Sequence, residues 1–88
     1  MKLRSEVQWF AEQMELKLRE NDDKGGWKRC SIEFLLDRLQ DEMMELDVSI
    51  QRGIPELLVA ECADVANFCM MLADNRRLIA KEESDDAE

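Results

Sequence analysis

The chain has 88 residues, enough for one small domain, and its 21 acidic and 12 basic side chains give a net charge of −9. An acidic surface repels the nucleic-acid backbone, so we expect no nucleic-acid partner. A domain of this length buries only about 60% of the surface that its unfolded chain exposes, and we expect association with further copies to stabilise it.

The first predicted helix covers residues 5–20. Ser5 and Gln8 have the spacing of a capping box, which satisfies free backbone amides at the start of a helix. Apolar side chains recur at helical intervals along one face, at Val7, Phe10, Met14 and Leu18. We expect Trp9 to lie in the core or in an interface. The polar, glycine-containing segment 21–26 ends the helix.

The second predicted helix runs from Ile32 to Arg52. Ser31 is the expected N-cap, and Gly53 is placed to end the helix. A regular apolar stripe follows one face and predicts that this face packs against the core. Its members are Ile32, Leu35, Leu36, Leu39, Met43, Leu46 and Ile50.

The third predicted helix begins at Pro55, a residue suited to the first turn, and extends through residue 75 or as far as residue 79. Residues 57–73 are apolar with three exceptions, which recur at every third position and form one stripe on the helix. The exceptions are Glu61, Asp64 and Asn67. Because the rest of this helix surface is apolar, we expect it to be covered on most sides.

These elements predict an all-α fold, an antiparallel bundle of about three helices per chain that homo-oligomerisation completes. No segment alternates apolar and polar residues with the period of a strand. The short link at residues 53–54 makes the second and third helices an antiparallel hairpin. The domain spans residues 1–80, and we expect the acidic residues 81–88 to form a disordered tail.

Cysteine usage and hydropathy indicate a cytoplasmic protein. Cys30, Cys62 and Cys69 form no CxxC pair, and we expect all three to be reduced. The N-terminal segment lacks the apolar stretch of a signal peptide. The apolar run 57–73 is short for a membrane span and carries two acids, so we expect no membrane association.

Two pairs of acidic residues have a spacing that places both members on one helix face. The pairs are Glu42 with Glu45, and Glu61 with Asp64. Because each residue adds ~1.5 Å along a helix axis, antiparallel helices joined by a tight turn bring the pairs to similar heights. Four converging carboxylates need a counter-charge. Oxygen ligands favour Mg²⁺, with Mn²⁺ next, and suit the handling of phosphate.

The same spacing has a simpler interpretation. Most ExxE pairs in acidic helices are solvated faces, and this applies above all to the first pair. The second pair lies in apolar surroundings, where Arg38, Arg52 or a neighbouring subunit are alternative partners. Zinc is not expected, because the chain has no histidine and no paired cysteines.

The acidic pairs belong to a longer ordered pattern. Fifteen residues separate Glu45 from Glu61, and residues 41–46 read DEMMEL. Residues 61–67 read ECADVAN, and residues 24–27 read KGGW. Together they resemble the MazG-like family of all-α nucleoside triphosphate pyrophosphohydrolases, in particular its short, phage-type members. The family pattern is EExxEL, a spacer and EAADVAN, with a KGxW loop; Asp41 stands here in place of the first glutamate.

The resemblance implies Mg²⁺-dependent hydrolysis of (d)NTPs to (d)NMP and pyrophosphate, a housecleaning reaction of the nucleotide pool, by a homodimer or homotetramer. It implies that four carboxylates hold the Mg²⁺, namely those of Glu42, Glu45, Glu61 and Asp64. Water attacks the α-phosphorus in this reaction. Because the chain has no histidine and no tyrosine, a carboxylate is the natural general base, and Asp41 and Glu42 are the candidates.

Four further residues are candidates for substrate binding. Lys24 and Lys28 lie in a glycine-containing loop, where they can meet phosphates. Trp27 can either stack on a nucleobase or anchor that loop. Asn67 continues the acidic stripe by one turn, and it can bind sugar or phosphate or orient a motif carboxylate.

Two other functions fit the same pattern. Phosphoribosyl-ATP pyrophosphatase shares the fold and the acidic residues, although the KGGW loop favours the nucleotide-pool enzyme. A non-catalytic helical module that only oligomerises or binds nucleotide would carry the pattern without hydrolysing anything.

Overall fold

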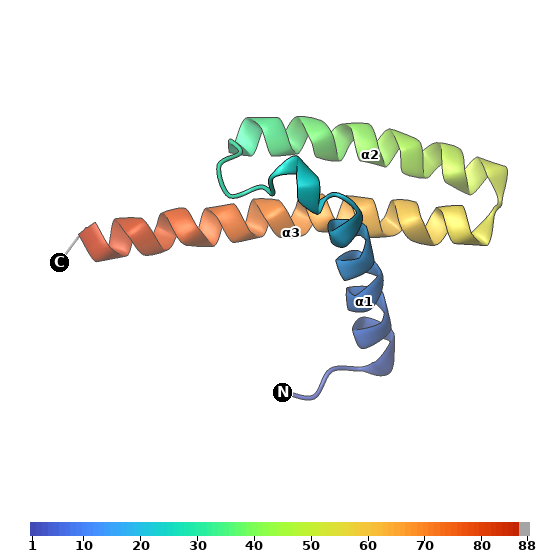
Figure 1. Cartoon of the computed structure of the whole chain (residues 1–88), viewed down its shortest axis with the longest axis horizontal. Coiled ribbons are helices and arrows are strands. Elements are labelled where there is room, and N and C mark those ends of the chain that lie inside the picture. The colour runs from blue at the N-terminus through green and yellow to red at the C-terminus, as the bar shows by residue number, and fades with distance from the viewer. Residues whose placement is uncertain (87–88) are drawn as a thin grey trace.

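The computed structural model describes residues 1–86, which contain three α-helices, one short 3-10 helix and no strand. The elements are α1 (Ser5–Glu20), η1 (Asp22–Lys24), α2 (Ile32–Arg52) and α3 (Pro55–Asp86). α2 and α3 lie antiparallel and side by side, and α1 crosses α3 steeply (Figure 1). The predicted all-α fold and the α2–α3 hairpin are confirmed.

Local sequence signals explain where α2 begins and ends. The Ser31 hydroxyl caps the helix by accepting a hydrogen bond of 3.1 Å from the amide of Phe34. At the other end, Gly53 adopts a positive φ of 70°, a conformation that side chains other than glycine disfavour, and its amide donates to the carbonyl of Ser49. Pro55 then occupies the first turn of α3, as predicted.

Two expectations about helix ends were wrong. The residue before α1 is Arg4, which makes no side-chain cap, and the Ser5 hydroxyl donates to Glu6 instead of forming a capping box with Gln8. Residues 81–86, which we assigned to a disordered tail, continue α3. No glycine or proline follows Pro55, so the sequence contains no residue that would break the helix earlier. Residues 87 and 88 of the predicted tail lie outside the described part of the chain.

The contact between α2 and α3 is the centre of the fold, and its buried apolar part is small. Leu35 and Ala63 are the described hydrophobic residues that are fully buried. Ser49, about four turns further along α2 than Leu35, is also buried and satisfies its hydroxyl by donating to the carbonyl of Leu46 at 2.8 Å. Such a small core leaves much apolar surface uncovered on the single chain.

The helical phase of α2 differs from the prediction at its centre. We expected Met43 to face the core with Glu42 on the shoulder of the stripe. Met43 is instead 54% exposed and Glu42 only 7% exposed. The apolar stripe is therefore split between two faces, and Leu36, Met43 and Ile50, seven residues apart, remain on the outer one.

A single buried amide fastens α1 to α3. Asn67 on α3 is 4% exposed, and its Nδ2 donates a hydrogen bond of 3.0 Å to the backbone carbonyl of Met14. α1 itself contains no buried residue. Trp9, expected in a core or an interface, is 49% exposed and packs its ring near that of Phe10.

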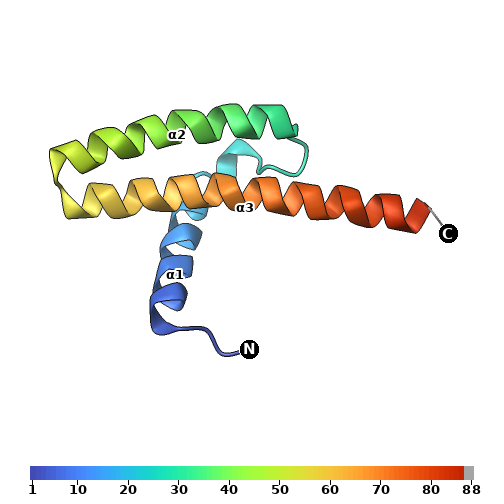
Figure 2. The ribbon, with the colours of Figure 1, turned by 180° about the vertical axis from the view of Figure 1, so that it is seen from behind.

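Figure 2 shows, from behind, the connection that leads from α1 to the start of α2. This connection is pinned to α3 by what we call the Trp27 clasp, formed by Trp27, Cys30, Asp74 and Asn75. The Trp27 indole donates to the Asp74 carboxylate at 3.0 Å. The Asn75 amide donates to the carbonyls of Trp27 and Cys30, both at 3.0 Å. Trp27 thus anchors the loop, one of its two predicted roles.

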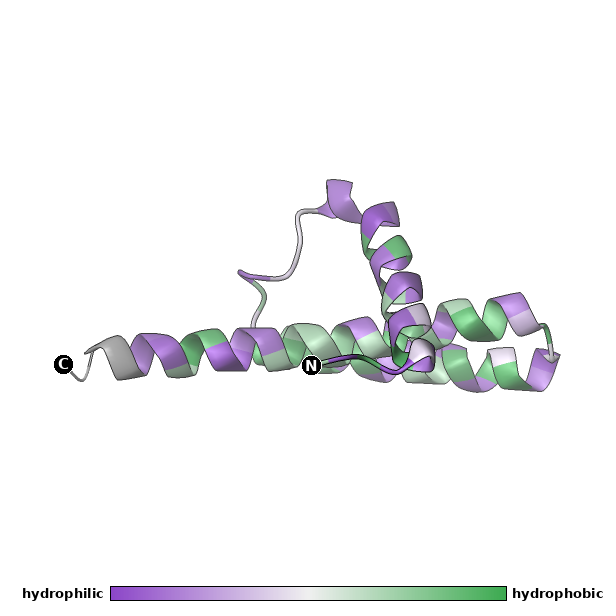
Figure 3. Ribbon diagram, turned by 90° about the horizontal axis from the view of Figure 1, so that it is seen from below, coloured by the Kyte–Doolittle hydropathy of each residue, from purple (hydrophilic) through white to green (hydrophobic). Residues whose placement is uncertain are grey.

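Hydrophobic and hydrophilic residues are mixed along all three helices (Figure 3). Between residues 1 and 86, no helix combines the length and the apolar character needed to cross a membrane. Cys30, Cys62 and Cys69 all carry free thiols.

We predict that Asn75→Ala destabilises the protein by about 2 kcal/mol, because two buried hydrogen bonds of the Trp27 clasp are lost together. Urea unfolding at one fixed protein concentration measures the effect. Arg76→Ala, at the exposed neighbouring position, is the control and changes the free energy of unfolding by less than about 0.5 kcal/mol. Equal effects of the two substitutions would contradict the assigned role of the clasp.

Candidate functional site

Three acidic side chains from two helices meet between α2 and α3. Glu42 and Glu45 on α2 and Glu61 on α3 each offer one carboxylate oxygen, and these oxygens lie within 4.8 Å of one another. Glu42 is buried, Glu61 half-buried and Glu45 exposed. The structure therefore brings together three of the four carboxylates that the sequence predicts to converge.

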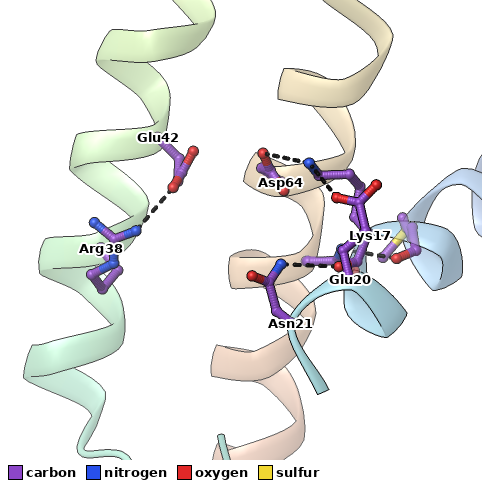
Figure 4. A network of polar contacts seen from close by, with 8 residues as sticks. Lys17, Glu20, Asn21, Arg38, Glu42 and Asp64 are labelled. Atoms are coloured by element: carbon purple, nitrogen blue, oxygen red, sulfur yellow. Dashed lines mark hydrogen bonds and ion pairs between the residues drawn. The ribbon is translucent and has the colours of Figure 1, made fainter. Parts of the chain in front are cut away.

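The fourth predicted member, Asp64, lies beside this cluster and faces Glu42 across the gap between the helices (Figure 4). Its Oδ2 is 3.7 Å from Nζ of Lys17, which reaches in from α1. Lys17 also donates to Glu20 at 3.0 Å. Asp64 is thus engaged by a basic side chain, but by Lys17 and not by Arg38 or Arg52, the partners that the sequence offered.

Arg38 is the second basic side chain at the cluster. Its Nη2 lies 3.0 Å from Oε1 of Glu42, and its Nη1 lies 3.1 Å from Oδ2 of Asp41. Oε2 of Glu42 and Oε2 of Glu61 are buried and have no hydrogen-bond partner. Two cations therefore face four carboxylates, and two buried oxygens lack the partner that such atoms normally have.

This imbalance shifts the pKa values of the cluster. Burial, followed by the neighbouring carboxylate of Glu45, raises the pKa of Glu42 to about 7. Burial and the charge of Asp64 raise the pKa of Glu61. Burial also raises the pKa of Asp64, although Lys17 opposes that shift. Each shift reports that a buried negative charge is incompletely compensated.

The donor set fits a hard divalent cation. All the ligand atoms are carboxylate oxygens, the type that Mg²⁺ and Mn²⁺ prefer. A cation among Glu42, Glu45 and Glu61 would supply the missing partner for both unpaired oxygens and lower the cost of burying the charges. The simpler interpretation, an exposed acidic face, does not describe Glu42 or Glu61.

A cavity of about 510 Å³ adjoins the cluster, and this volume lies within the usual range for small-molecule sites. Its charged walls are formed by the bases Lys17, Lys24 and Arg38 and by the acids Glu20, Asp22, Glu42 and Asp64. Its apolar walls include Trp27, Phe34, Phe68 and Met71. A cavity with both kinds of wall suits a ligand that has an anionic part and a flat, weakly polar part.

The other sequence-predicted residues fall at different places relative to this cavity. Lys24 and Trp27 line it. Lys28 is 70% exposed, lies 3.9 Å from Asp74 and is not among the residues lining this cavity. Asp41 is 61% exposed and is likewise absent from the cavity walls.

Asn67 takes neither of its predicted roles in the described structure, since its amide nitrogen fastens α1 to α3. Its Oδ1 is buried without a partner. The amide therefore acts on the site indirectly, by placing the helix that carries Lys17.

Sequence reasoning missed four residues that shape the site: Lys17, Arg38 as a cavity residue, Asp74 and Asn75. Arg38 stands four residues before Glu42, a spacing that predicts an ion pair on a helix. Asp74 stands seven residues after Asn67 and continues the polar stripe of α3. Lys17 comes from a separate helix, and no local pattern places it.

Comparisons of this chain with known protein families, with curated proteins and with solved structures give no match. The resemblance to the MazG-like family stays a prediction from the motif residues. The argument for a function therefore depends on the chemistry of the site.

We predict that the metal-free protein loses stability as pH rises from about 4.5 to about 7. The raised pKa of Glu42 means that the folded state binds more protons than the unfolded state in this window, so ionising the carboxyl favours unfolding. Glu42→Gln should reduce this loss and make the metal-free protein more stable than the wild type at pH 8.

Urea unfolding in the presence of a chelator, repeated across pH 4 to 8, checks this expectation. Asp47→Asn is the matched control, because Asp47 is an exposed acid on the same helix outside the cluster. A pH dependence that Glu42→Gln and Asp47→Asn change by the same amount would contradict it.

Proposed function

We propose that this chain is a cytoplasmic, Mg²⁺-dependent nucleoside triphosphate pyrophosphohydrolase of the MazG-like type, which converts (d)NTPs to (d)NMP and pyrophosphate. One observation carries the proposal. Carboxylates of Glu42, Glu45 and Glu61 from two helices lie within 4.8 Å of one another, with two buried oxygens unpaired, beside a cavity of ligand size.

Glu42, Glu45 and Glu61 are the residues that would hold the ion, with Asp64 as a fourth ligand when it leaves Lys17. Bound Mg²⁺ would supply positive charge that offsets part of the charge of the triphosphate and stabilises the charge developing on the leaving pyrophosphate. The carboxylates fix this charge at one side of the cavity, so the triphosphate is oriented toward α2 and α3.

The apolar walls of the cavity suit the base. Phe34 and Phe68 offer ring faces, and the indole of Trp27 is held in place by its hydrogen bond to Asp74. A ring whose position is already fixed loses little conformational entropy when a base stacks on it. Lys24, on the same cavity, supplies positive charge for phosphate.

Of the two candidates for general base, we assign the role to Glu42. Arg38 pairs with both residues, but Glu42 lines the cavity, whereas Asp41 lies on an exposed face outside it. The Glu42 carboxylate accepts the proton of the water that attacks the α-phosphorus. Asp41 then acts on the site only through its contact with Arg38.

The proposal includes a homodimer or homotetramer. Leu36, Met43 and Ile50 leave an apolar stripe with a seven-residue period on the outer face of α2, and this period suits packing against another helix. Trp9 and Leu16, seven residues apart on α1, leave a second exposed apolar pair, and Leu3 and Val7 are exposed elsewhere near the N-terminus. A second copy of the chain would cover surfaces that the small core leaves exposed.

We predict that Glu45→Gln and Glu61→Gln each reduce pyrophosphate release by about 100-fold or more, because each removes a charged ligand of the ion. The assay uses a panel of canonical and modified (d)NTPs with Mg²⁺, and a chelator should abolish the signal. Asp47→Asn, a matched loss of one exposed acid on α2, should retain activity within about twofold.

The same assay separates the alternative functions. Faster turnover of phosphoribosyl-ATP than of any (d)NTP would favour phosphoribosyl-ATP pyrophosphatase. Absence of pyrophosphate from every substrate with the wild-type protein would favour a non-catalytic helical module.

We also predict that Ile50→Glu shifts the protein toward the monomer in sedimentation velocity, because it places a charge in the apolar stripe of α2. Gln51→Glu adds the same charge at the exposed neighbouring position and should leave the oligomer intact. A wild-type protein that sediments as a monomer at micromolar concentration would contradict the oligomer.

A further inference from the structure

Two basic side chains engage the acidic residues from opposite sides. Arg38 on α2 pairs with Glu42, at 3.0 Å, and Lys17 on α1 lies 3.7 Å from Asp64. Figure 4 shows Glu42 and Asp64 between the two cations. Both basic side chains also line the 510 Å³ cavity. Arg38 and Lys17 therefore each contact one of the proposed ligands of the cation, Glu42 or Asp64, and also line the cavity.

In neither ion pair do the two groups form all the hydrogen bonds with each other that their geometry allows. Arg38 gives Glu42 one hydrogen bond rather than a two-bond fork, and Oε2 of that carboxylate has no partner. The distance between Lys17 and Asp64 exceeds ordinary hydrogen-bond length. The Lys17–Asp64 pair is therefore weak. Glu42 is buried and needs a counter-charge, but a divalent cation among the carboxylates would supply that charge in place of Arg38.

Both cations keep a second contact when they leave these carboxylates. The Arg38 guanidinium lies over the Phe68 ring, 5.4 Å from its centre, in a favourable cation–π position. Lys17 retains its hydrogen bond to Glu20. The two groups consequently stay at the cavity wall after their carboxylate partners are taken.

We propose that Arg38 and Lys17 are the phosphate-binding residues of the site, and that each pairs with an acid of the ion site until a divalent cation displaces it. This inference rests on the proposed function and names the side chains that recognise the anionic part of its substrate. A triphosphate carries more negative charge than one divalent cation neutralises, so further donors are required. Arg38 offers a planar fork suited to phosphate oxygens, and Lys17 offers a mobile point charge.

If a cation displaces Arg38 from Glu42, removing Arg38 should affect the affinities for metal and for polyphosphate in opposite directions. Removing Arg38 removes a competitor for Glu42, so the metal alone should bind as tightly as before, or more tightly. Removing Arg38 also removes a phosphate donor, so binding of a polyphosphate should weaken. A residue that only supports the fold would weaken both.

The test compares the wild type with Arg38→Gln and Lys17→Met in two titrations. The first follows binding of Mn²⁺ alone by the electron paramagnetic resonance signal of free Mn²⁺. The second follows binding of inorganic tripolyphosphate, premixed with Mg²⁺, by calorimetry, which removes any contribution from the base. Far-ultraviolet circular dichroism verifies that each variant is folded.

Each variant should bind Mn²⁺ with an affinity between that of the wild type and about fivefold higher. Each should bind tripolyphosphate about tenfold more weakly. Arg38→Lys keeps the charge without the fork, so its tripolyphosphate affinity should fall between those of the wild type and Arg38→Gln. It also serves as the test variant if Arg38→Gln does not fold. Arg19→Gln, an equal loss of charge at an exposed position of α1, should match the wild type in both titrations.

Three results would overturn the inference. If Arg38→Gln and Lys17→Met bound tripolyphosphate as tightly as the wild type, the inference would be wrong. Normal pyrophosphate release by the wild type would still support the proposed function in that case. If the variants bound Mn²⁺ and tripolyphosphate more weakly by the same factor, Arg38 and Lys17 would have a structural role only. A wild-type protein that binds neither Mn²⁺ nor tripolyphosphate would end the proposed function and this inference together.

Discussion

The chemistry of the site is determined by an incompletely compensated negative charge between α2 and α3. Carboxylates from both helices enter the contact, and the surrounding burial raises the pKa values of Glu42, Glu61 and Asp64. Two cations cannot neutralise this group, and two buried oxygens keep no partner. A chain with so small an apolar core gains nothing in stability from such an arrangement. The cation that we propose would compensate this charge at the centre of the main helix contact.

The other long-range polar contacts position the walls of the cavity beside these carboxylates. Asn67 fastens α1 to α3 and so brings Lys17 to Asp64. The Trp27 clasp draws the loop before α2 onto α3, which closes the cavity with an aromatic ring and brings Lys24 to its wall. Each contact is a hydrogen bond between residues far apart in sequence. The polar residues of α3 thus have two tasks. Glu61 and Asp64 supply carboxylates to the site, and Asn67, Asp74 and Asn75 hold α1 and the loop in place.

The sequence predicts the α2 helix and its hairpin well, because their signals are local. Ser31 and Gly53 act on the backbone within one turn of their own positions. The inward phase of Glu42 was missed, because a broad apolar stripe does not show which of its edges meets α3. Lys17 was missed because its partner Asp64 lies on another helix, and no local pattern in α1 shows where α1 crosses α3.

Assembly and the site are physically linked through α1. This helix has no buried residue of its own, yet it carries Lys17. A hydrogen bond from Asn67 and a loose ion pair hold it at the site, while Val7, Trp9 and Leu16 remain exposed. Covering these side chains with a second copy would restrict the motion of α1 and fix the distance between Lys17 and the carboxylates. The proposed dimer would therefore also set the geometry for the exchange of Asp64 for phosphate that we propose for Lys17.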